Sequence, residues 1–512
     1  MTSEGPLTTG AHAADSQDPS GTLDPAPTMP SETAAPGPIA PSGPVAPSER
    51  PRSAAPTTSS GPAAPGETAA PTGPTTSSGP AAPSGPAAPS KPARSWRNVG
   101  PDLRPLSVPA YRRLFIGQVF TVVGSMITAV AVQQQVFDLT GSSAWVGFAS
   151  LVALMPLVIF GLLGGAIADT YDRRRLLIVT SVGIALTSIG LWLAALGGSE
   201  SVWTVFALLA LQQAFFAVNQ PTRSAIIPRI VPVELVPSAN ALGMTVFSIG
   251  VIVGPLLVGV LIPIVGLAWL YFIDALTLVA ILYAVLRLPP VPPLGERRGR
   301  AKVVDGLRYL WLKPLLLMTF VVDIIAMVFG MPRALFPQMA EETFGGAIGG
   351  GYQLGVLNAA LAVGALIGGL TGGWIHRVHR QGIAIVAAIV VWGASMALYG
   401  TTSILWLAAI FLAVGGWADL VSAVYRSTIL QVNATDEMRG RMQGVFTVVV
   451  AGGPRVADLV HGLVASATST AFATTVGGIA TIVLTLVAAA IGRSLVRYDT
   501  RDRDDGGGPA PG

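Results

Sequence analysis

The sequence predicts an all-α membrane protein with about twelve transmembrane helices in two halves of six, and two observations lead to this fold class. The 512 residues are 51% hydrophobic and only 11% charged, whereas soluble domains average about 25% charged residues. Long apolar runs also recur along the chain, and a helix needs about 20 such residues to cross roughly 30 Å of hydrocarbon. This composition suits lipid better than water.

The first segment, residues 1–93, consists almost entirely of Pro, Ala, Gly, Ser and Thr. The block TTSSGPAAP begins at Thr57 and again at Thr75. Such a composition cannot bury a core, so we expect a disordered, PPII-rich leader. It lacks the basic start and apolar run of a secretion signal, which predicts that it stays in the cytoplasm. A spacer is its expected role, and partner binding through the Pro-rich stretches is the alternative.

The apolar runs divide the rest of the chain into two predicted six-helix bundles, over residues 112–288 and 314–493. A basic cytoplasmic linker at 289–313 joins them, and a cytoplasmic tail follows at 494–512. Each run is predicted to be a helix, because lipid forces backbone groups to pair within the segment and no alternating pattern indicates a barrel. The runs are centred roughly on residues 114–137, 145–168, 176–197, 203–227, 238–262, 265–286, 314–339, 352–375, 382–400, 403–430, 443–465 and 470–492.

The distribution of Lys and Arg predicts the orientation in the membrane. Arg112 and Arg113 precede the first run, and the linker is rich in Lys and Arg, whereas the loops at 138–144, 197–201 and 341–351 contain neither. The positive-inside rule therefore predicts a protein of the cell (inner or plasma) membrane with both termini on the cytoplasmic side. The net charge of +4 is read as a topology signal, so no nucleic-acid partner is expected.

A gating motif is predicted after the second run, where the sequence reads Gly165-Ala-Ile-Ala-Asp169-Thr-Tyr-Asp172-Arg173-Arg174-Arg175. Gly165 permits close helix approach, Asp169 can face a helix N-terminus, and the arginines can pair with carboxylates. The stretch resembles the loop 2–3 motif of the major facilitator superfamily, with Thr170 and Asp172 where Arg and Gly are usual. It is predicted to latch the two halves on the cytoplasmic side; the alternative is simple anchoring of a loop by Arg173 and Arg174.

A second motif lies in the fifth run, which contains Gly250, Gly254, Pro255 and Gly259. The glycines permit tight helix contact, and the proline removes one backbone hydrogen bond and kinks the helix. The stretch resembles the antiporter motif of exporters in this superfamily, which favours efflux over uptake. Helix packing alone is the alternative.

Ionisable residues are concentrated in the spans of the second half, where a charge is expensive and marks a pathway or proton relay. Asp419 and Arg426 are seven residues apart, and Arg455 and Asp458 three apart, so each pair shares a helix face. Asp323 has no opposite charge nearby in sequence and is the preferred proton carrier, with Asp419 next. The alternative is that buried ion pairs only orient the helices. The full set of coupling candidates is Asp323, Asp419, Asp458, Arg333, Arg426 and Arg455, with His461 nearby.

Uncharged polar groups near the first and fourth runs are candidates for the substrate cavity. Gln133 and Gln134 end the first run, and Asn219 and Arg223 lie around the fourth; these groups can hydrogen-bond an oxygen-rich ligand. The alternative is that they meet lipid headgroups at helix ends. Asp274 in the sixth run is predicted to be a helix-packing residue. Cysteine is absent, which excludes disulfides and thiol chemistry, and no cofactor or metal is expected.

Several stretches together resemble the enterobactin exporter family of the major facilitator superfamily, also described as transmembrane secretion effectors. The resemblance implies a secondary exporter whose halves rock around a cargo site near the bilayer midplane. It further implies proton antiport, with Asp323 or Asp419 protonated from outside and Arg333 or Arg426 tuning its pKa. A monomer and small-molecule cargo are expected. The stretches are AVQQQVFDLTGSS, PTRSAIIPRIVPVEL, SANAL, DIIAMVFGMPRALFPQMA, ADLVSAVYRSTILQ, DEMRGRMQGVF and GPRVADLVHG.

The rival function classes have weaker support in the sequence. A siderophore of enterobactin type is the preferred cargo, and a multidrug or macrolide-type efflux transporter is the main alternative. A polytopic membrane enzyme is a remote alternative, because no HExxH, Gly-x-Ser-x-Gly or Walker motif occurs. A sensor or scaffold would need a soluble output domain, which neither the leader nor the tail can form.

Overall fold

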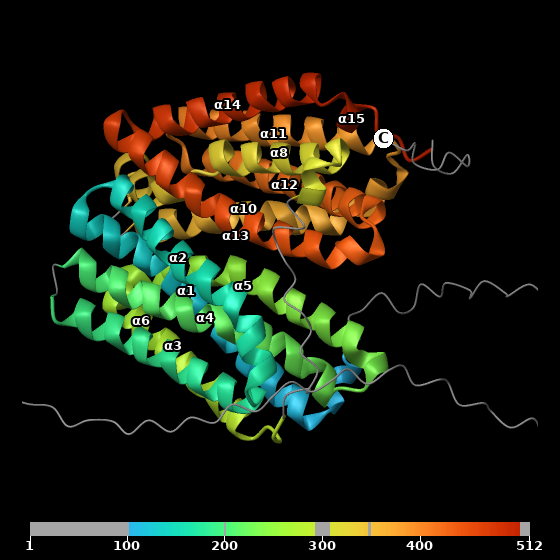
Figure 1. Ribbon diagram of the computed structural model, residues 1–512. Helices are drawn as coiled ribbons and strands as arrows, with labels where there is room; N and C mark the ends of the chain where they lie inside the picture. The colour runs from blue at the N-terminus through green and yellow to red at the C-terminus, as the bar shows by residue number, and fades with distance from the viewer. Residues whose placement is uncertain (1–101, 199–200, 292–307, 347–349, 502–512) are drawn as a thin grey trace, which may run out of the picture. The chain divides into compact units, whose positions relative to one another are not determined.

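The computed structural model describes residues 102–198, 201–291, 308–346 and 350–501 (Figure 1). Within these ranges every regular element is helical, as the apolar runs predicted. The predicted leader at 1–93, most of the linker at 289–313 and most of the tail at 494–512 lie outside the described residues.

The first bundle consists of six helices (Figure 1). Local sequence signals set several of their ends. Pro109 occupies the first turn of α1, where its missing N–H removes no helical bond. The α2 helix begins after Ser142, whose hydroxyl accepts from the Ala144 N–H at 3.3 Å, a common helix cap. The helices are α1 (Pro109–Thr140), α2 (Ser143–Thr170), α3 (Arg173–Leu196), α4 (Val202–Ile230), α5 (Val236–Val265) and α6 (Leu267–Leu286).

The second bundle has six long helices and one irregular segment. The predicted run at 314–339 is interrupted: α8 ends at Gly330, and three short turns, η4 (Arg333–Leu335), α9 (Phe336–Gln338) and η5 (Met339–Thr343), follow it. The cause is Pro332, which lacks an N–H and disfavours helical backbone at Met331. The long helices are α8 (Pro314–Gly330), α10 (Gly351–Thr371), α11 (Gln381–Thr401), α12 (Leu405–Asn433), α13 (Asp436–Ala467) and α14 (Thr470–Ile491).

Eleven helices among the described residues are long and apolar enough to cross a membrane. The predicted run at 443–465 lies within the longer helix α13, which is not one of the eleven. Arg455, Asp458 and His461 lower the hydropathy of this helix, although Asp458 and His461 are buried within the protein. A count of twelve spans therefore remains a prediction.

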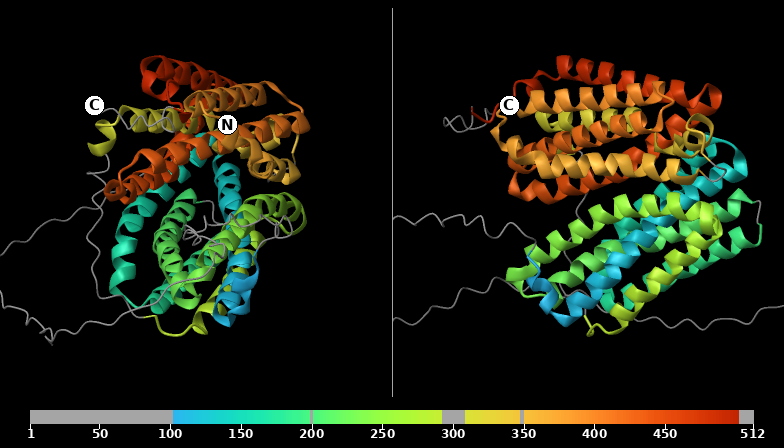
Figure 2. Two further views of the ribbon diagram at one scale, coloured as in Figure 1. Left: turned by 90° about the vertical axis from the view of Figure 1, so that its right-hand side faces the viewer. Right: turned by 180° about the vertical axis from the view of Figure 1, so that it is seen from behind.

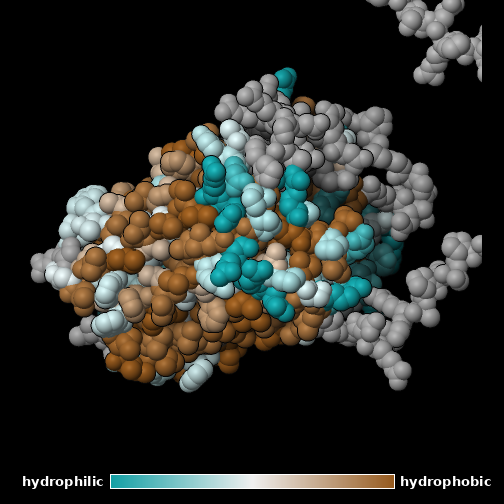
Figure 3. Space-filling view, turned by 90° about the horizontal axis from the view of Figure 1, so that it is seen from below, coloured by the Kyte–Doolittle hydropathy of each residue, from teal (hydrophilic) through white to brown (hydrophobic). Residues whose placement is uncertain are grey.

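The outward surface of the first bundle is broadly apolar, as a lipid-facing surface requires. Figure 3 shows hydrophobic residues over much of this face, with hydrophilic residues gathered on one side of it. Exposed large hydrophobic side chains include Leu186 and Leu193 of α3 and Leu276 and Val279 of α6. A contiguous apolar patch on this scale is uncommon on a soluble monomer.

A short segment before α1 is tied to the start of α5. The carboxylate of Asp102 accepts hydrogen bonds from the Arg104 guanidinium at 2.7 Å and from the Ser238 hydroxyl at 2.8 Å. These donors, chiefly the Arg104 side chain, hold the pKa of Asp102 below its usual range. The ionised carboxylate therefore links η2 (Arg104–Ser107) to the first turn of α5, which contains Ser238.

Small residues allow the closest helix contacts in the second bundle, where α10 packs along α12. A Cβ added to Gly364 of α10 would overlap the carbonyl oxygen of Ala413, and one added to Gly416 of α12 would overlap that of Leu361. These reciprocal contacts are between backbone atoms, which cannot move aside as a flexible side chain can. The spacing of α10 and α12 thus depends on the two glycines.

We expect Gly364→Ala to lower the stability of the folded protein by about 1–3 kcal/mol, the usual cost of overpacking. Gly369→Ala is the matched control on the same helix, since its Cβ would lie 3.7 Å from the Leu420 side chain, an ordinary contact. Thermal unfolding in detergent compares the two variants. Equal stability of both variants would contradict this account of the α10–α12 contact.

The two bundles contact each other through α2 with α13 and through α5 with α10. Gly147, near the start of α2, packs on the backbone of Asp458 and Leu459, and Gly259, near the end of α5, packs on Tyr352 and its neighbours at the start of α10. These contacts lie toward the helix ends joined by the α1–α2, α5–α6 and α13–α14 connections. Figure 2 shows the courses of the helices in two further views.

Candidate functional site

A cavity of about 510 Å³ lies between the two bundles. Its lining is mainly apolar and comes from α1, α5, α10 and α12, with η4 and Trp392 of α11 also contributing. A second cavity of about 340 Å³ reaches α2, α3, α4, α6 and α13. Met126, Ala129, Gln133 and Arg333 line both. The two spaces therefore adjoin and form one candidate cargo site, which we call the central cavity.

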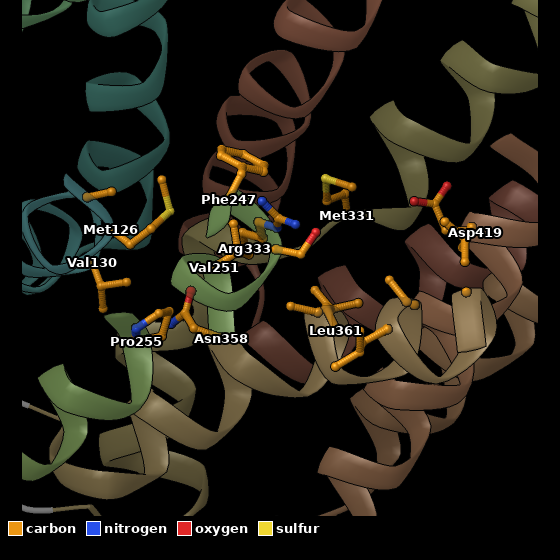
Figure 4. A pocket seen from close by; sticks show the side chains of 18 of the residues that line it. Met126, Val130, Phe247, Val251, Pro255, Met331, Arg333, Asn358, Leu361 and Asp419 are labelled. Carbon is orange, nitrogen blue, oxygen red and sulfur yellow. The ribbon is translucent and has the colours of Figure 1, made fainter. Parts of the chain in front are cut away.

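Arg333 is placed at the centre of this site by the break after α8. Figure 4 shows its side chain among Val251, Met331 and Leu361, with Asp419 farther along the wall. Arg333 is exposed. Within the described ranges no carboxylate lies within 4.0 Å of it, although the buried Asp458 is near enough for the two charges to interact. A guanidinium in a largely apolar cavity is costly unless an anion or polar group joins it. The site can therefore accept an anionic, oxygen-rich group, which a guanidinium binds through two parallel hydrogen bonds.

Three of the coupling candidates come together on α8 and α12. An Arg426 nitrogen lies 2.9 Å from Asp323 Oδ1 and 3.8 Å from Asp419 Oδ1. The Arg426 and Asp323 side chains are 4% and 2% exposed, whereas Asp419 is 39% exposed and lines the central cavity. Arg426 also donates to the Ser422 hydroxyl at 2.9 Å. The result is a chain of charges from the cavity wall into the bundle, which we call the Asp–Arg–Asp chain.

Asp419 is the member of this chain that the cavity reaches, and the Arg426 guanidinium lies within 4 Å of both carboxylates. The predicted shared face of Asp419 and Arg426 is confirmed by their contact. The partner of Asp323 is Arg426. The sequence did not indicate this pair, because the two residues lie about 100 positions apart in the chain, on α8 and α12.

The predicted ion pair between Arg455 and Asp458 is not formed. Arg455 donates to the Ala451 carbonyl at 2.7 Å. Asp458 instead accepts from the Ser150 hydroxyl at 2.7 Å and from the Ala334 N–H at 3.1 Å. Because Ser150 belongs to α2, the carboxylate links the two bundles. Ser150, Arg455 and Asp458 line the central cavity. Ala334 and Ala451 take part only through backbone groups.

Further polar contacts between the bundles lie near the same helix ends. Gln134 of α1 donates to Glu341 of η5 at 2.7 Å and, within its own helix, to Asp138 at 2.6 Å. Ser143 of α2 donates to Gln338 of α9 at 2.7 Å. The Gln134 side chain is fully buried, so its predicted place in the cavity lining is not found. Gln133, in contrast, lines both parts of the cavity.

The predicted gating motif is only partly described. Gly165 and Asp169 lie in α2, but their side chains are outside the described part of the chain. Asp172 caps α3 by accepting from the Arg175 N–H at 2.9 Å, and Arg174 donates to the Leu286 carbonyl at 2.6 Å. These two contacts fasten the loop to α3 and α6 within the first bundle. The contribution of Arg173, which is buried, to a latch between the bundles remains a prediction.

The predicted antiporter motif lies between α1 and α10. A Cβ on Gly250 would overlap Val122, and one on Gly254 would overlap Met126, both on α1. Gly259 faces α10, and the Pro255 carbonyl lies 2.8 Å from where a Cβ on Gly355 would stand. The motif thus contacts both bundles, and Pro255 lines the central cavity beside Asn358 (Figure 4).

Asn219 and Arg223 line a space of about 50 Å³ inside the first bundle. This space adjoins the central cavity, with which it shares Met126, Phe247 and Asp274, but neither residue lines the central cavity itself. Asn219 donates to the Thr180 hydroxyl at 2.8 Å, and Arg223 donates to Asn219 at 3.2 Å.

Sequence reasoning missed several residues of the site. Of these, Asn358, a lone amide in an apolar run, carried a signal, whereas Phe247, Met331 and Trp392 resemble ordinary apolar residues of a span.

Two bundles of membrane-length helices around a shared cavity define a membrane transporter fold. The transmembrane secretion effector family model matches residues 101–505. The chain therefore belongs to this branch of the major facilitator superfamily, which confirms the predicted resemblance and excludes the enzyme alternative.

Individual relatives agree with this assignment. The enterobactin exporter EntS of Citrobacter koseri is 28% identical over 373 residues, which cover 72% of this chain and 88% of that protein. The enterobactin exporter EntS of Salmonella typhi is 29% identical over 395 residues, which cover 76% and 94%.

Solved structures support the fold alone. The nucleoside transporter NupG aligns with a TM-score of 0.60 and 14% identity, covering 76% of this chain and 100% of that chain. A bacterial homologue of the human lysosomal transporter Spinster, in an inward-facing and unoccupied conformation, has a TM-score of 0.60 and 14% identity, covering 80% and 100%.

Proposed function

We propose that this protein is a secondary active exporter that moves a small organic molecule out of the cytoplasm in exchange for protons. The observation that carries the proposal is the central cavity, whose wall holds both an exposed guanidinium and one end of the Asp–Arg–Asp chain. A cargo site and a proton site on one wall are what an exchanger needs. The resemblance of the fifth helix to the antiporter motif supports the outward direction.

The proposed cargo is a siderophore of the enterobactin type. The names of the relatives support this choice, and so does the chemistry of Arg333, which suits oxygen anions better than the cations that many drugs carry. Gln133 and Asn358 add neutral hydrogen-bonding groups on the same wall. The apolar lining, with Met126, Phe247 and Trp392, also suits a macrolide or other large drug, so drug efflux is the second candidate.

We further propose a topology with twelve spans, α13 included, and with both termini in the cytoplasm. The burial of Asp458 and His461 allows α13 to cross despite its charges, and the distribution of Lys and Arg supports the orientation. The inter-bundle contacts then lie at the extracellular ends, and the described conformation opens the cavity toward the cytoplasm. Function as a monomer is proposed, as is a cytoplasmic latch formed by the gating motif in the opposite state.

The cargo is tested by deleting the gene in iron-starved cells. We expect a siderophore to be lost from the medium and to accumulate in the cytoplasm, because synthesis continues while exit is blocked. Mass spectrometry of medium and cytoplasm measures this, with a strain that carries the restored gene as control. A restored gene that encodes Arg333→Gln should leave the cargo inside, since the amide removes the charge.

An unchanged siderophore profile in the deletion strain would reject this cargo. The same cells would then be exposed to macrolides and to cationic drugs. Increased sensitivity to these compounds would support the drug-efflux candidate, and the family assignment would stand in either case.

A further inference from the structure

A carboxylate is buried in the first bundle, away from the Asp–Arg–Asp chain. Asp274 of α6 is 2% exposed. Its Oδ2 atom accepts hydrogen bonds from the Thr128 hydroxyl of α1 at 2.7 Å and from the Ser188 hydroxyl of α3 at 2.8 Å. Gln212 of α4 donates to Ser188 at 3.1 Å. Three other helices, α1, α3 and α4, thus supply polar groups around this one acid of α6, which is more than the predicted packing role requires.

No basic group neutralises this acid. Among the described residues, Asp274 forms no ion pair, and its hydrogen-bond donors are neutral hydroxyls. The α5 helix has no titratable side chain, and those of α1 and α3 lie near the helix ends. Around the adjoining spaces, the titratable groups are Arg223 of α4, Arg333 of η4, and Arg455 and Asp458 of α13.

A carboxylate in such a place is costly when ionised, because hydroxyl donors replace only part of its hydration. A proton removes the charge and leaves the existing hydrogen bonds in place. The Oδ2 atom already accepts two of them, so Oδ1, which lies beside the Thr277 hydroxyl, is the oxygen available for the proton. Gly124 of α1 keeps room for this oxygen, since a Cβ there would lie 2.5 Å from Oδ1.

Asp274 also has a route to the cargo site. It lines both the 340 Å³ part of the central cavity and the 50 Å³ space beside it. Water in the cavity can therefore bring or remove a proton without crossing a packed helix interface. The same space reaches Gln133 and Arg333, so the charge on Asp274 is felt where cargo is proposed to bind.

We propose that Asp274 is a second proton-binding site, so that each bundle contains one acid that exchanges protons with the central cavity. On release, the proton leaves Oδ1 for water in the cavity, and the carboxylate keeps the Thr128 and Ser188 donors. The proton binding itself does not depend on the proposed function. Its use in transport rests on that function, with up to two protons exchanged in each cycle.

Infrared difference spectroscopy of the purified full-length protein in lipid, with the pH stepped, tests the proposal. We expect the unaltered protein to show a protonated-carboxyl band from Asp274 that disappears as the pH is raised. Asp274→Asn should remove this band and leave the others, and Asp323→Asn, the matched control, should leave it intact. A spectrum of Asp274→Asn that still contains every pH-dependent carboxyl band would overturn the proposal.

Two further measurements keep the outcome clear. If Asp274→Asn does not fold, Asp274→Glu serves instead, and it should shift the band and its midpoint pH. Replacing sodium with choline at fixed pH should leave the band unchanged; a sodium-dependent loss would show a metal-cation site and reject the proton assignment. Neither measurement needs cargo, so the proposed export function can fail while the proton site stands, and the reverse.

Discussion

Arg426→Met is expected to lower the stability of the folded protein by about 3–5 kcal/mol, the cost of leaving a buried charge without its partner. The charge left behind is that of Asp323, which is 2% exposed and loses a contact of 2.9 Å. The double variant Asp323→Leu with Arg426→Met should recover most of the loss, because two apolar side chains can replace a buried pair. Thermal unfolding in detergent measures all three proteins.

The same variants separate folding from transport. We expect the double variant to fold but to lose pH-driven efflux at least tenfold in proteoliposomes, since Asp419 remains on the cavity wall without the arginine and the inner acid that complete the chain. Asp323→Asn and Asp419→Asn test the two acids singly. If both retained full pH-driven efflux at normal expression, the proposed coupling role of the Asp–Arg–Asp chain would be wrong.

Linking Ser143→Cys to Gln338→Cys with a short, reducible thiol cross-linker is expected to stop transport almost completely. The two native side chains hydrogen-bond across the bundles at 2.7 Å, so a link between these positions fixes the described conformation and prevents the alternation that transport needs. Radiolabelled cargo or a drug substrate in proteoliposomes measures the loss. The natural chain contains no cysteine, so no background labelling interferes.

The controls for this experiment are internal. Each single cysteine variant should transport normally after the same treatment, and reduction of the linker should restore activity in the double variant. Full activity of the linked protein would show that these helix ends do not separate during the cycle.

Much of the fold could be predicted because lipid leaves the backbone few choices. The apolar runs located the long helices, but they did not show the break after α8. That break begins at Pro332, a single residue within a run that is otherwise mostly apolar. The predicted run at 443–465 and the helix α13 also differ in extent, because the helix continues through charged residues at its start.

The site was harder to predict, because helical spacing relates only residues on one helix. It correctly paired Asp419 with Arg426, which are seven residues apart. Helical spacing did not identify the partners of Asp458, because its carboxylate accepts hydrogen bonds from Ser150 and Ala334 on other elements and not from Arg455. The partner of Asp323 and the surroundings of Asp274 depend on how different helices pack, which a single sequence does not specify.

The position of Asp419 has a consequence for the efficiency of the proposed exchange. Its side chain is the end of the Asp–Arg–Asp chain that lines the central cavity, whereas Asp323 is enclosed behind Arg426. Cargo seated against this wall would cover the entry point for the proton, so the two ligands exclude each other. Mutual exclusion of this kind suppresses slippage, in which protons leak inward without cargo moving outward.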